Sequence, residues 1–164
     1  MIFIKRKNSV RGICIAAMIA ALYVVLTYVS AIFGLSSGVI QLRLSEAMCV
    51  LPAFTPYAIV GLSIGCLISN LLFGGIIWDV IFGTLATLLG AVGSYYVGKR
   101  SKYLALIPPI VSNCIIIPLV LCYGYGAEES LIFMFVTVGI GEVLSCGVLG
   151  AVFAKVLRRF GNIF

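Results

Sequence analysis

The chain has 164 residues, of which 63% are hydrophobic and only 10% are charged, and its mean hydropathy is +1.25. Soluble globular domains are about 45–50% apolar and about 25% charged, so this composition excludes a water-soluble fold and indicates an integral membrane protein. The net charge of +6 does not indicate nucleic-acid binding, because ten of the eleven basic residues lie in three short clusters that flank apolar runs. Cytoplasmic loops of membrane proteins have this pattern.

The three basic clusters predict how often the chain crosses the membrane. They lie at residues 5–11, 99–102 and 155–159, and the positive-inside rule places all three in the cytoplasm. An even number of crossings must therefore separate neighbouring clusters. One crossing needs about 20 residues, so four fit between the first two clusters and two between the last two. We expect an all-α plasma-membrane protein, a single domain over residues 1–164, with six transmembrane helices and both termini cytoplasmic.

Turn-forming residues set the limits of the six predicted spans. These run over about residues 13–33, 42–54, 57–73, 77–97, 104–123 and 131–154, with turns at residues 34–38 and at Gly74 and Gly75. The first span is longer than the 7–15 apolar residues of a signal peptide, which favours an uncleaved helix. The second is too short to cross a bilayer alone, so we expect it to be tilted, surrounded by protein or part of a cavity wall.

Small residues form a stripe on the first predicted helix. Ala16 with Ala20, and Ala17 with Ala21, make two overlapping AxxxA steps. Small residues four positions apart allow another helix to approach closely. The stripe therefore predicts close approach of another helix, and packing within the protein is the plainest interpretation.

Four charged residues fall within or at the edge of the predicted spans: Arg43, Glu46, Asp79 and Glu142. Charges at such depths are costly and indicate a functional site by default. Arg43 and Glu46 are three positions apart and would share one helix face, where a self-contained ion pair is the alternative interpretation. For Asp79, beside Trp78, the alternative is an acidic helix N-terminus in an interfacial aromatic belt.

Glu142 is the most telling of the four, because it lies about 13 residues from either polar end of its helix. At 1.5 Å per residue this is about 20 Å, near the middle of the bilayer. Such a carboxyl group must face protein, water or ligand, and a structural hydrogen bond is the alternative. Asn70 and Asn113 are polar residues that could join the same pocket, although helix–helix hydrogen bonds would explain them equally well.

The charged set has one positive and three negative members, so it favours a ligand that is cationic or rich in hydrogen-bond donors. Trp78 could stack on a planar ring. There is no histidine, the six cysteines are scattered without metal-type spacing, and no Walker A motif is present. We therefore expect no metal site, no cofactor and no ATP hydrolysis in this chain.

Several segments form a combination that is specific enough to compare with known families: Leu42-Arg43-Leu44-Ser45-Glu46-Ala47, Leu51-Pro52, Trp78-Asp79 followed by Gly83 and Thr87, Pro108-Pro109, and Gly141-Glu142. Together they resemble the QueT family, substrate-binding (S) components of energy-coupling factor transporters linked to uptake of queuosine precursors. The resemblance covers nearly the whole chain. The Arg-x-x-Glu and Asp-x-x-x-Gly-x-x-Ala-Thr patterns are its more specific parts.

The resemblance implies a six-helix S-component fold that binds 7-aminomethyl-7-deazaguanine or a related base such as queuine. It implies as partners a transmembrane coupling subunit and two cytoplasmic ATPases that use the ATP, with the AxxxA face docking on the coupling subunit. Asp79 and Glu142 are the expected acceptors for the ligand's donor groups, and Arg43 or an amide side chain is the expected donor to its carbonyl. Glu46, Asn70 and Asn113 are further candidates.

Three other classes remain open at this level. A proton-coupled secondary transporter would use Glu142 as its proton carrier. An intramembrane enzyme is remote, because the spans contain no histidine, metal cluster or Ser/Lys dyad. A purely structural membrane subunit would have no reason to bury several carboxyl groups.

Overall fold

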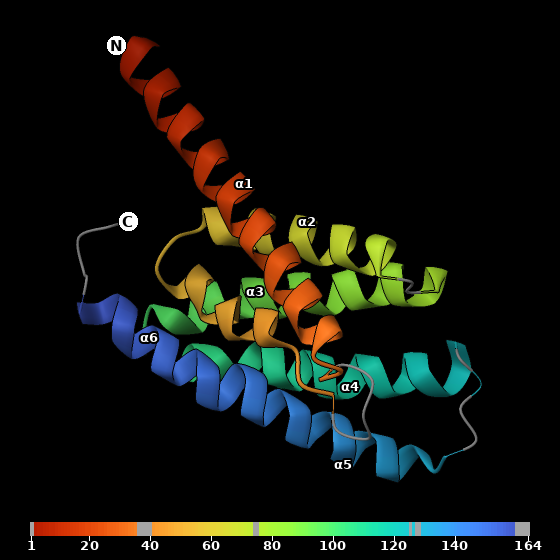
Figure 1. The fold of residues 1–164 in the computed structure, drawn as a ribbon. Helices are drawn as coiled ribbons and strands as arrows, with labels where there is room; N and C mark the ends of the chain where they lie inside the picture. The colour runs from red at the N-terminus through yellow and green to blue at the C-terminus, as the bar shows by residue number, and fades with distance from the viewer. Residues whose placement is uncertain (1, 36–40, 74–75, 125, 127–128, 160–164) are drawn as a thin grey trace.

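The computed structural model describes residues 2–35, 41–73, 76–124, 126 and 129–159, and it contains no β-strand in these ranges. Its elements are α1 (Ile2–Ile32), η1 (Leu44–Ala53), α2 (Tyr57–Leu72), η2 (Asp79–Gly83), α3 (Thr84–Gly98), η3 (Leu104–Leu106), α4 (Ile107–Gly124), α5 (Leu131–Glu142), η4 (Val143–Leu149) and α6 (Gly150–Arg159). The segments η1 and η3 are 3₁₀-helical, and η2 and η4 are π-helical. As Figure 1 shows, α5, η4 and α6 form one continuous rod.

Four helical stretches are long and apolar enough to cross a membrane: Val10–Ile32, Asp79–Gly98, Leu104–Gly124 and Leu131–Arg159. They match the predicted spans that begin at residues 13, 77, 104 and 131. The helices continue further than predicted at two ends, to Ile2 and to Arg159, because Lys and Arg are good helix formers and extend a helix beyond its apolar part.

The other two predicted spans form shorter helices, η1 with 10 residues and α2 with 16. At about 2.0 Å per residue, η1 is about 20 Å long, less than the hydrocarbon core of about 30 Å. Residues 48–53 of η1 are buried, and the segment contacts α1, α3, α6 and η4. This confirms that the short second segment is enclosed by protein.

Small residues bring α1 and α2 into close contact. A Cβ atom on Gly61 of α2 would lie 2.7 Å from the carbonyl oxygen of Ala16, and one on Gly65 would lie 3.0 Å from that of Ala20. Distances of this kind leave room only for hydrogen. The glycines of α2 therefore pack on the Ala16 and Ala20 side of α1.

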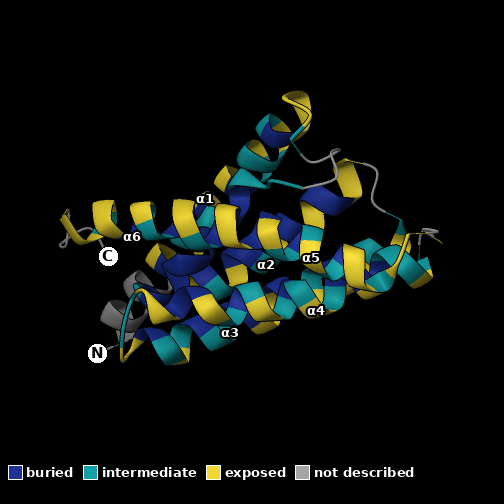
Figure 2. Cartoon of the chain, turned by 90° about the horizontal axis from the view of Figure 1, so that it is seen from below, coloured by how far each residue is buried: buried dark blue, intermediate teal, exposed yellow. Residues whose placement is uncertain are grey.

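The surface of the bundle is apolar, as expected when lipid is the solvent. Figure 2 shows exposed residues on the outward sides of the helices and buried residues between them, and the exposed set includes large side chains such as Ile13, Leu71 and Ile132. The start of α1 and the end of α6 lie at the same end of the bundle (Figures 1 and 2). The predicted turn at Gly74 and Gly75 and most of the turn at 34–38 lie outside the described residues.

Candidate binding site

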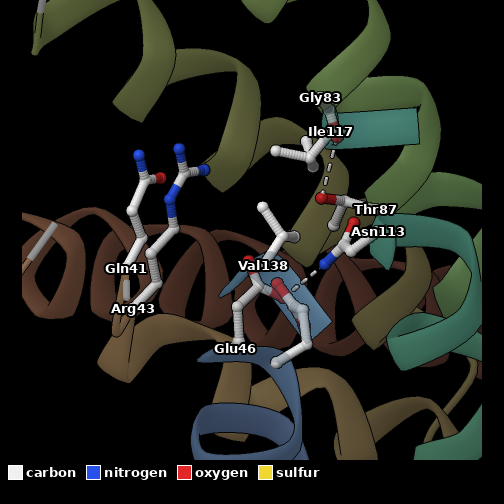
Figure 3. Close-up of a pocket in the computed structure, with 9 residues that line it drawn as sticks. Gln41, Arg43, Glu46, Gly83, Thr87, Asn113, Ile117 and Val138 are labelled. Atoms are coloured by element: carbon white, nitrogen blue, oxygen red, sulfur yellow. Dashed lines mark hydrogen bonds between the residues drawn. The ribbon is translucent and has the colours of Figure 1, made fainter. Parts of the chain in front are cut away.

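A cavity of about 20 Å³ lies where the segment 41–46 meets η2, α3, α4 and α5. Its lining consists of Gln41, Arg43, Glu46, Gly83, Thr87, Asn113, Ile117, Val138 and Glu142, most of them labelled in Figure 3. The fold thus brings together four of the seven predicted ligand-binding residues, from positions as far apart as Arg43 and Glu142. The space holds about one water molecule, so a larger ligand needs movement of the lining side chains.

The backbone before η1 orients two of these side chains. Arg43 is the N-cap of η1 and has extended geometry, with φ −107° and ψ 107°. Residues two apart in an extended segment point the same way, and Figure 3 shows Gln41 and Arg43 lying parallel, with no hydrogen bond to the other residues drawn. The prediction that Arg43 and Glu46 share a helix face is wrong, because the helix begins only at Leu44.

Hydroxyl groups from neighbouring helices hold this segment in place. The first N–H groups of a helix have no partner within it. Here the amide of Arg43 donates to Ser145 Oγ over 3.1 Å, and the amide of Leu44 donates to Ser30 Oγ over 2.9 Å. The segment is therefore anchored to η4 on one side and to α1 on the other.

Glu46 is buried, with 2% of its surface exposed, and three side chains donate to its carboxylate. Oε1 accepts from the Tyr23 hydroxyl at 2.5 Å, and Oε2 accepts from Cys49 Sγ at 3.0 Å and from Asn113 Nδ2 at 3.4 Å. Buried polar atoms are normally paired in this way. The carboxylate is consequently held in one orientation at the cavity wall.

Glu142 contrasts with Glu46. It is 9% exposed and interacts with Asn113, yet its Oε2 atom is buried without a hydrogen-bond partner in the described part of the chain. An unpaired buried acceptor is uncommon, because it loses its bonds to water and gains none in return. Glu142 therefore offers a free acceptor to a donor that enters the cavity.

Both π-helical segments border the cavity. The segment η2 ends at Gly83, and η4 begins directly after Glu142. Single π-helical turns inside α-helices occur frequently at functional sites. In this chain η2 contains the lining residue Gly83, and η4 follows the lining residue Glu142 and presents the Ser145 hydroxyl to the segment 41–46.

Asp79 and Asn70 lie beside the cavity rather than in its lining. The Asn70 amide donates to the carbonyl oxygen of Asp79 over 3.1 Å. A Cβ atom on Gly83 would lie 3.0 Å from Asn70 Nδ2 and 3.4 Å from Asp79 Oδ1, so both side chains lie next to this lining residue. Asp79 still interacts electrostatically with Arg43.

Trp78 lies on the outer surface. It is 51% exposed, and its ring stacks on Phe82 with centroids 5.9 Å apart and an interplanar angle of 16°. Both rings line a separate apolar groove of about 440 Å³ between α3 and α4. Trp78 is thus not one of the residues that line the polar cavity.

The two AxxxA steps of α1 have different environments. Ala20 is buried and Ala16 half-buried against α2, whereas Ala17 and Ala21 are exposed. Of the four predicted docking residues, only the second pair is open to a partner.

Sequence reasoning missed Tyr23, which makes the shortest contact to Glu46. A signal was present, because Tyr23, Thr27 and Ser30 follow an i, i+4, i+7 pattern on an otherwise apolar helix. All three bond to the segment 44–46, Thr27 through Ser45 Oγ at 2.9 Å. Thr87 was noticed only as part of a motif.

Comparison with known proteins identifies the family. The family described as QueT transporter matches residues 13–159. The chain belongs to the QueT transporter family. The queuosine precursor transporter QueT of Lactococcus lactis subsp. cremoris is 40% identical over 85 residues, which cover 51% of this chain and 49% of that protein. The alignment thus spans about half the length of the curated relative. No solved structure matches the chain.

Membership of the QueT family agrees with the membrane architecture. Together with the four long apolar helices, it makes this chain a multi-pass protein of the plasma membrane. The family consists of transporters and not of enzymes. The polar cavity is therefore a candidate for ligand binding rather than for catalysis.

Proposed function

We propose that this chain is the substrate-binding subunit of an ATP-driven energy-coupling factor importer and captures a queuosine precursor from outside the cell. The ligand is 7-aminomethyl-7-deazaguanine or queuine. Membership of the QueT family and the name of the Lactococcus lactis relative support this function. So does a cavity whose polar groups suit a base with several hydrogen-bond donors.

The observation that carries the proposal is the unpaired Oε2 atom of Glu142. A deazaguanine presents a ring N–H and an amino group side by side, which a carboxylate accepts as a pair. The aminomethyl ammonium group suits a second carboxylate, and Glu46 lines the same cavity. Arg43 or Gln41 then donates to the carbonyl oxygen of the base.

Ligand capture requires the cavity to widen, because about 20 Å³ does not accommodate a bicyclic base. Gln41 and Arg43 are the side chains that move in this proposal, since both are long and half-buried. Glu46, held by Tyr23 and Asn113, stays in position. Asp79 and Asn70 lie next to Gly83, and Asp79 interacts electrostatically with Arg43. In this proposal neither side chain contacts the base.

The subunit crosses the membrane six times, with η1 and α2 as the two short crossings and with both termini in the cytoplasm. The common location of the start of α1 and the end of α6 is consistent with this topology (Figure 1). The partners are a transmembrane coupling subunit and two cytoplasmic ATPases, which supply the ATP hydrolysis. Ala17 and Ala21 dock on the coupling subunit, because they are the exposed members of the AxxxA stripe.

Calorimetry on the purified full chain in detergent tests the proposal, with 7-aminomethyl-7-deazaguanine, queuine and guanine as ligands. We expect tight binding of a deazapurine and much weaker binding of guanine. The Glu142→Gln variant should lose about 10- to 150-fold in affinity, corresponding to one hydrogen bond to a charged group. Glu129→Gln, an exposed residue outside the cavity, is the matched control and should bind like the wild type.

Two outcomes would contradict the proposal. Full affinity of a folded Glu142→Gln variant would refute the role of this carboxylate. No binding of any of the three ligands to folded protein would refute the ligand class. Uptake by the chain alone in a proton gradient would then indicate a secondary transporter.

A further inference from the structure

The end of the bundle that the proposed topology places in the cytoplasm carries a concentrated positive charge. Two segments contribute it, residues 99–103 and 155–159, with the basic residues Lys99, Arg100, Lys102, Lys155, Arg158 and Arg159. None of the five acidic residues of the chain falls in either segment. The two segments meet in the structure, because Arg158 Cζ lies 5.8 Å from the centre of the Tyr103 ring.

Within the described part of the chain, the partners of these cations are aromatic rings and a carbonyl group rather than carboxylates. Lys99 Nζ lies 4.5 Å from the centre of the Tyr95 ring, and Lys102 Nζ lies 5.0 Å from that of Phe54 and donates to the carbonyl oxygen of Ala53. A ring orients a cation without cancelling its charge. Among the described residues no carboxylate cancels this charge, so it is available to an external anion.

Apolar side chains adjoin the same positive charges. On α6, Val152, Val156 and Arg159 follow an i, i+4, i+7 pattern and all three are exposed. This face thus presents an apolar stripe that ends in a guanidinium group. Next to Arg158, Tyr103 is 45% exposed, as is typical of tyrosines at a membrane interface.

We propose that this surface, formed by Lys99, Arg100, Tyr103, Lys155, Arg158 and Arg159, binds the headgroup of an anionic phospholipid. The phosphate group contacts the guanidinium groups of Arg158 and Arg159. One acyl chain lies along Val152 and Val156. An acidic protein surface would match the charge but would leave the adjoining apolar stripe uncovered, so a lipid fits both parts of the surface. The site is separate from the polar cavity and does not depend on the identity of the transported ligand.

Native mass spectrometry tests the proposal on full-length protein released from nanodiscs that contain equal amounts of phosphatidylglycerol and phosphatidylcholine with the same acyl chains. We expect the wild type to retain phosphatidylglycerol in preference. Arg158→Gln/Arg159→Gln should reduce this preference by roughly five-fold for each charge removed. Arg158→Lys/Arg159→Lys, which keeps the charge, should retain most of it.

Lys5→Gln/Lys7→Gln is the matched control, because it removes the same charge from the N-terminal cluster. It should leave the preference unchanged. Equal loss in both double variants would mean general electrostatic attraction and would overturn the site, as would equal retention of the two lipids by the wild type. Thermal unfolding of each variant in detergent verifies that it is folded. Displacement of the lipid by 10 mM glycerol phosphate would show that the headgroup alone binds and would overturn the role of the apolar stripe.

Discussion

Replacing Tyr23 by Phe removes one hydroxyl group and tests how the cavity is held. The hydroxyl donates to Glu46 Oε1 over 2.5 Å, a length typical of a strong bond between a hydroxyl and a carboxylate. Tyr23 is 1% exposed and Glu46 2%, so water does not replace the lost donor. Loss of a hydrogen bond to a charged group costs about 1.5–3 kcal/mol. We expect the free energy of unfolding to fall by about 2 kcal/mol.

Equilibrium unfolding in mixed detergent and SDS measures this change, with the fluorescence of Trp78, the only tryptophan, as the probe. Tyr28→Phe is the control on the same helix. Its side chain is 52% exposed and stacks on Phe73, and a phenylalanine keeps that contact. The control should stay within about 0.5 kcal/mol of the wild type. A difference between the two variants smaller than this would refute the inference that the hydroxyl holds Glu46.

Three further predictions concern packing, docking and capping. Gly61→Val should lower the unfolding free energy by about 1–3 kcal/mol because its Cβ would crowd Ala16, and an unchanged unfolding midpoint would contradict the α1–α2 contact. Ala17→Leu, on the exposed side, should leave the midpoint unchanged yet abolish copurification with the proposed coupling subunit. Intact copurification would exclude that face as the docking surface. Lys102→Met removes the ammonium group that donates to the carbonyl oxygen of Ala53, so the free energy of unfolding should fall by about 1 kcal/mol in the same assay. An unchanged value would show that water replaces the lost donor.

The positions of the helices could be predicted from the sequence because the membrane constrains the composition of each segment that crosses it. A segment that crosses lipid must be apolar over about 20 residues and must satisfy its own backbone, which only a helix does within one segment. The predicted spans at 77–97 and 104–123 therefore lie close to the observed stretches Asp79–Gly98 and Leu104–Gly124. The exact ends of the helices were less predictable, because Lys and Arg residues can extend a helix beyond its apolar part. For this reason α1 begins at Ile2 rather than near residue 13.

The candidate site was only partly predictable. Arg43, Glu46, Asn113 and Glu142 stood out because charged and amide groups are costly in lipid, and the structure brings them to one cavity. Their geometry was not predictable from spacing. The interval between Arg43 and Glu46 indicated a shared helix face, whereas Arg43 is extended and its amide bonds to Ser145, 102 positions away.

The sequence by itself determined the class of protein, the positions of its helices and a small set of polar residues. Because burying these residues in a membrane is costly, they indicated a functional site. Each of these depends on local composition in a solvent that penalises charge. Only the tertiary structure decided which carboxylate receives three hydrogen bonds and which keeps an unpaired oxygen, which alanines are covered, and that Tyr23 holds Glu46. Hydrogen-bond partners and exposure depend on the helices that pack alongside, and spacing along one chain does not contain that information.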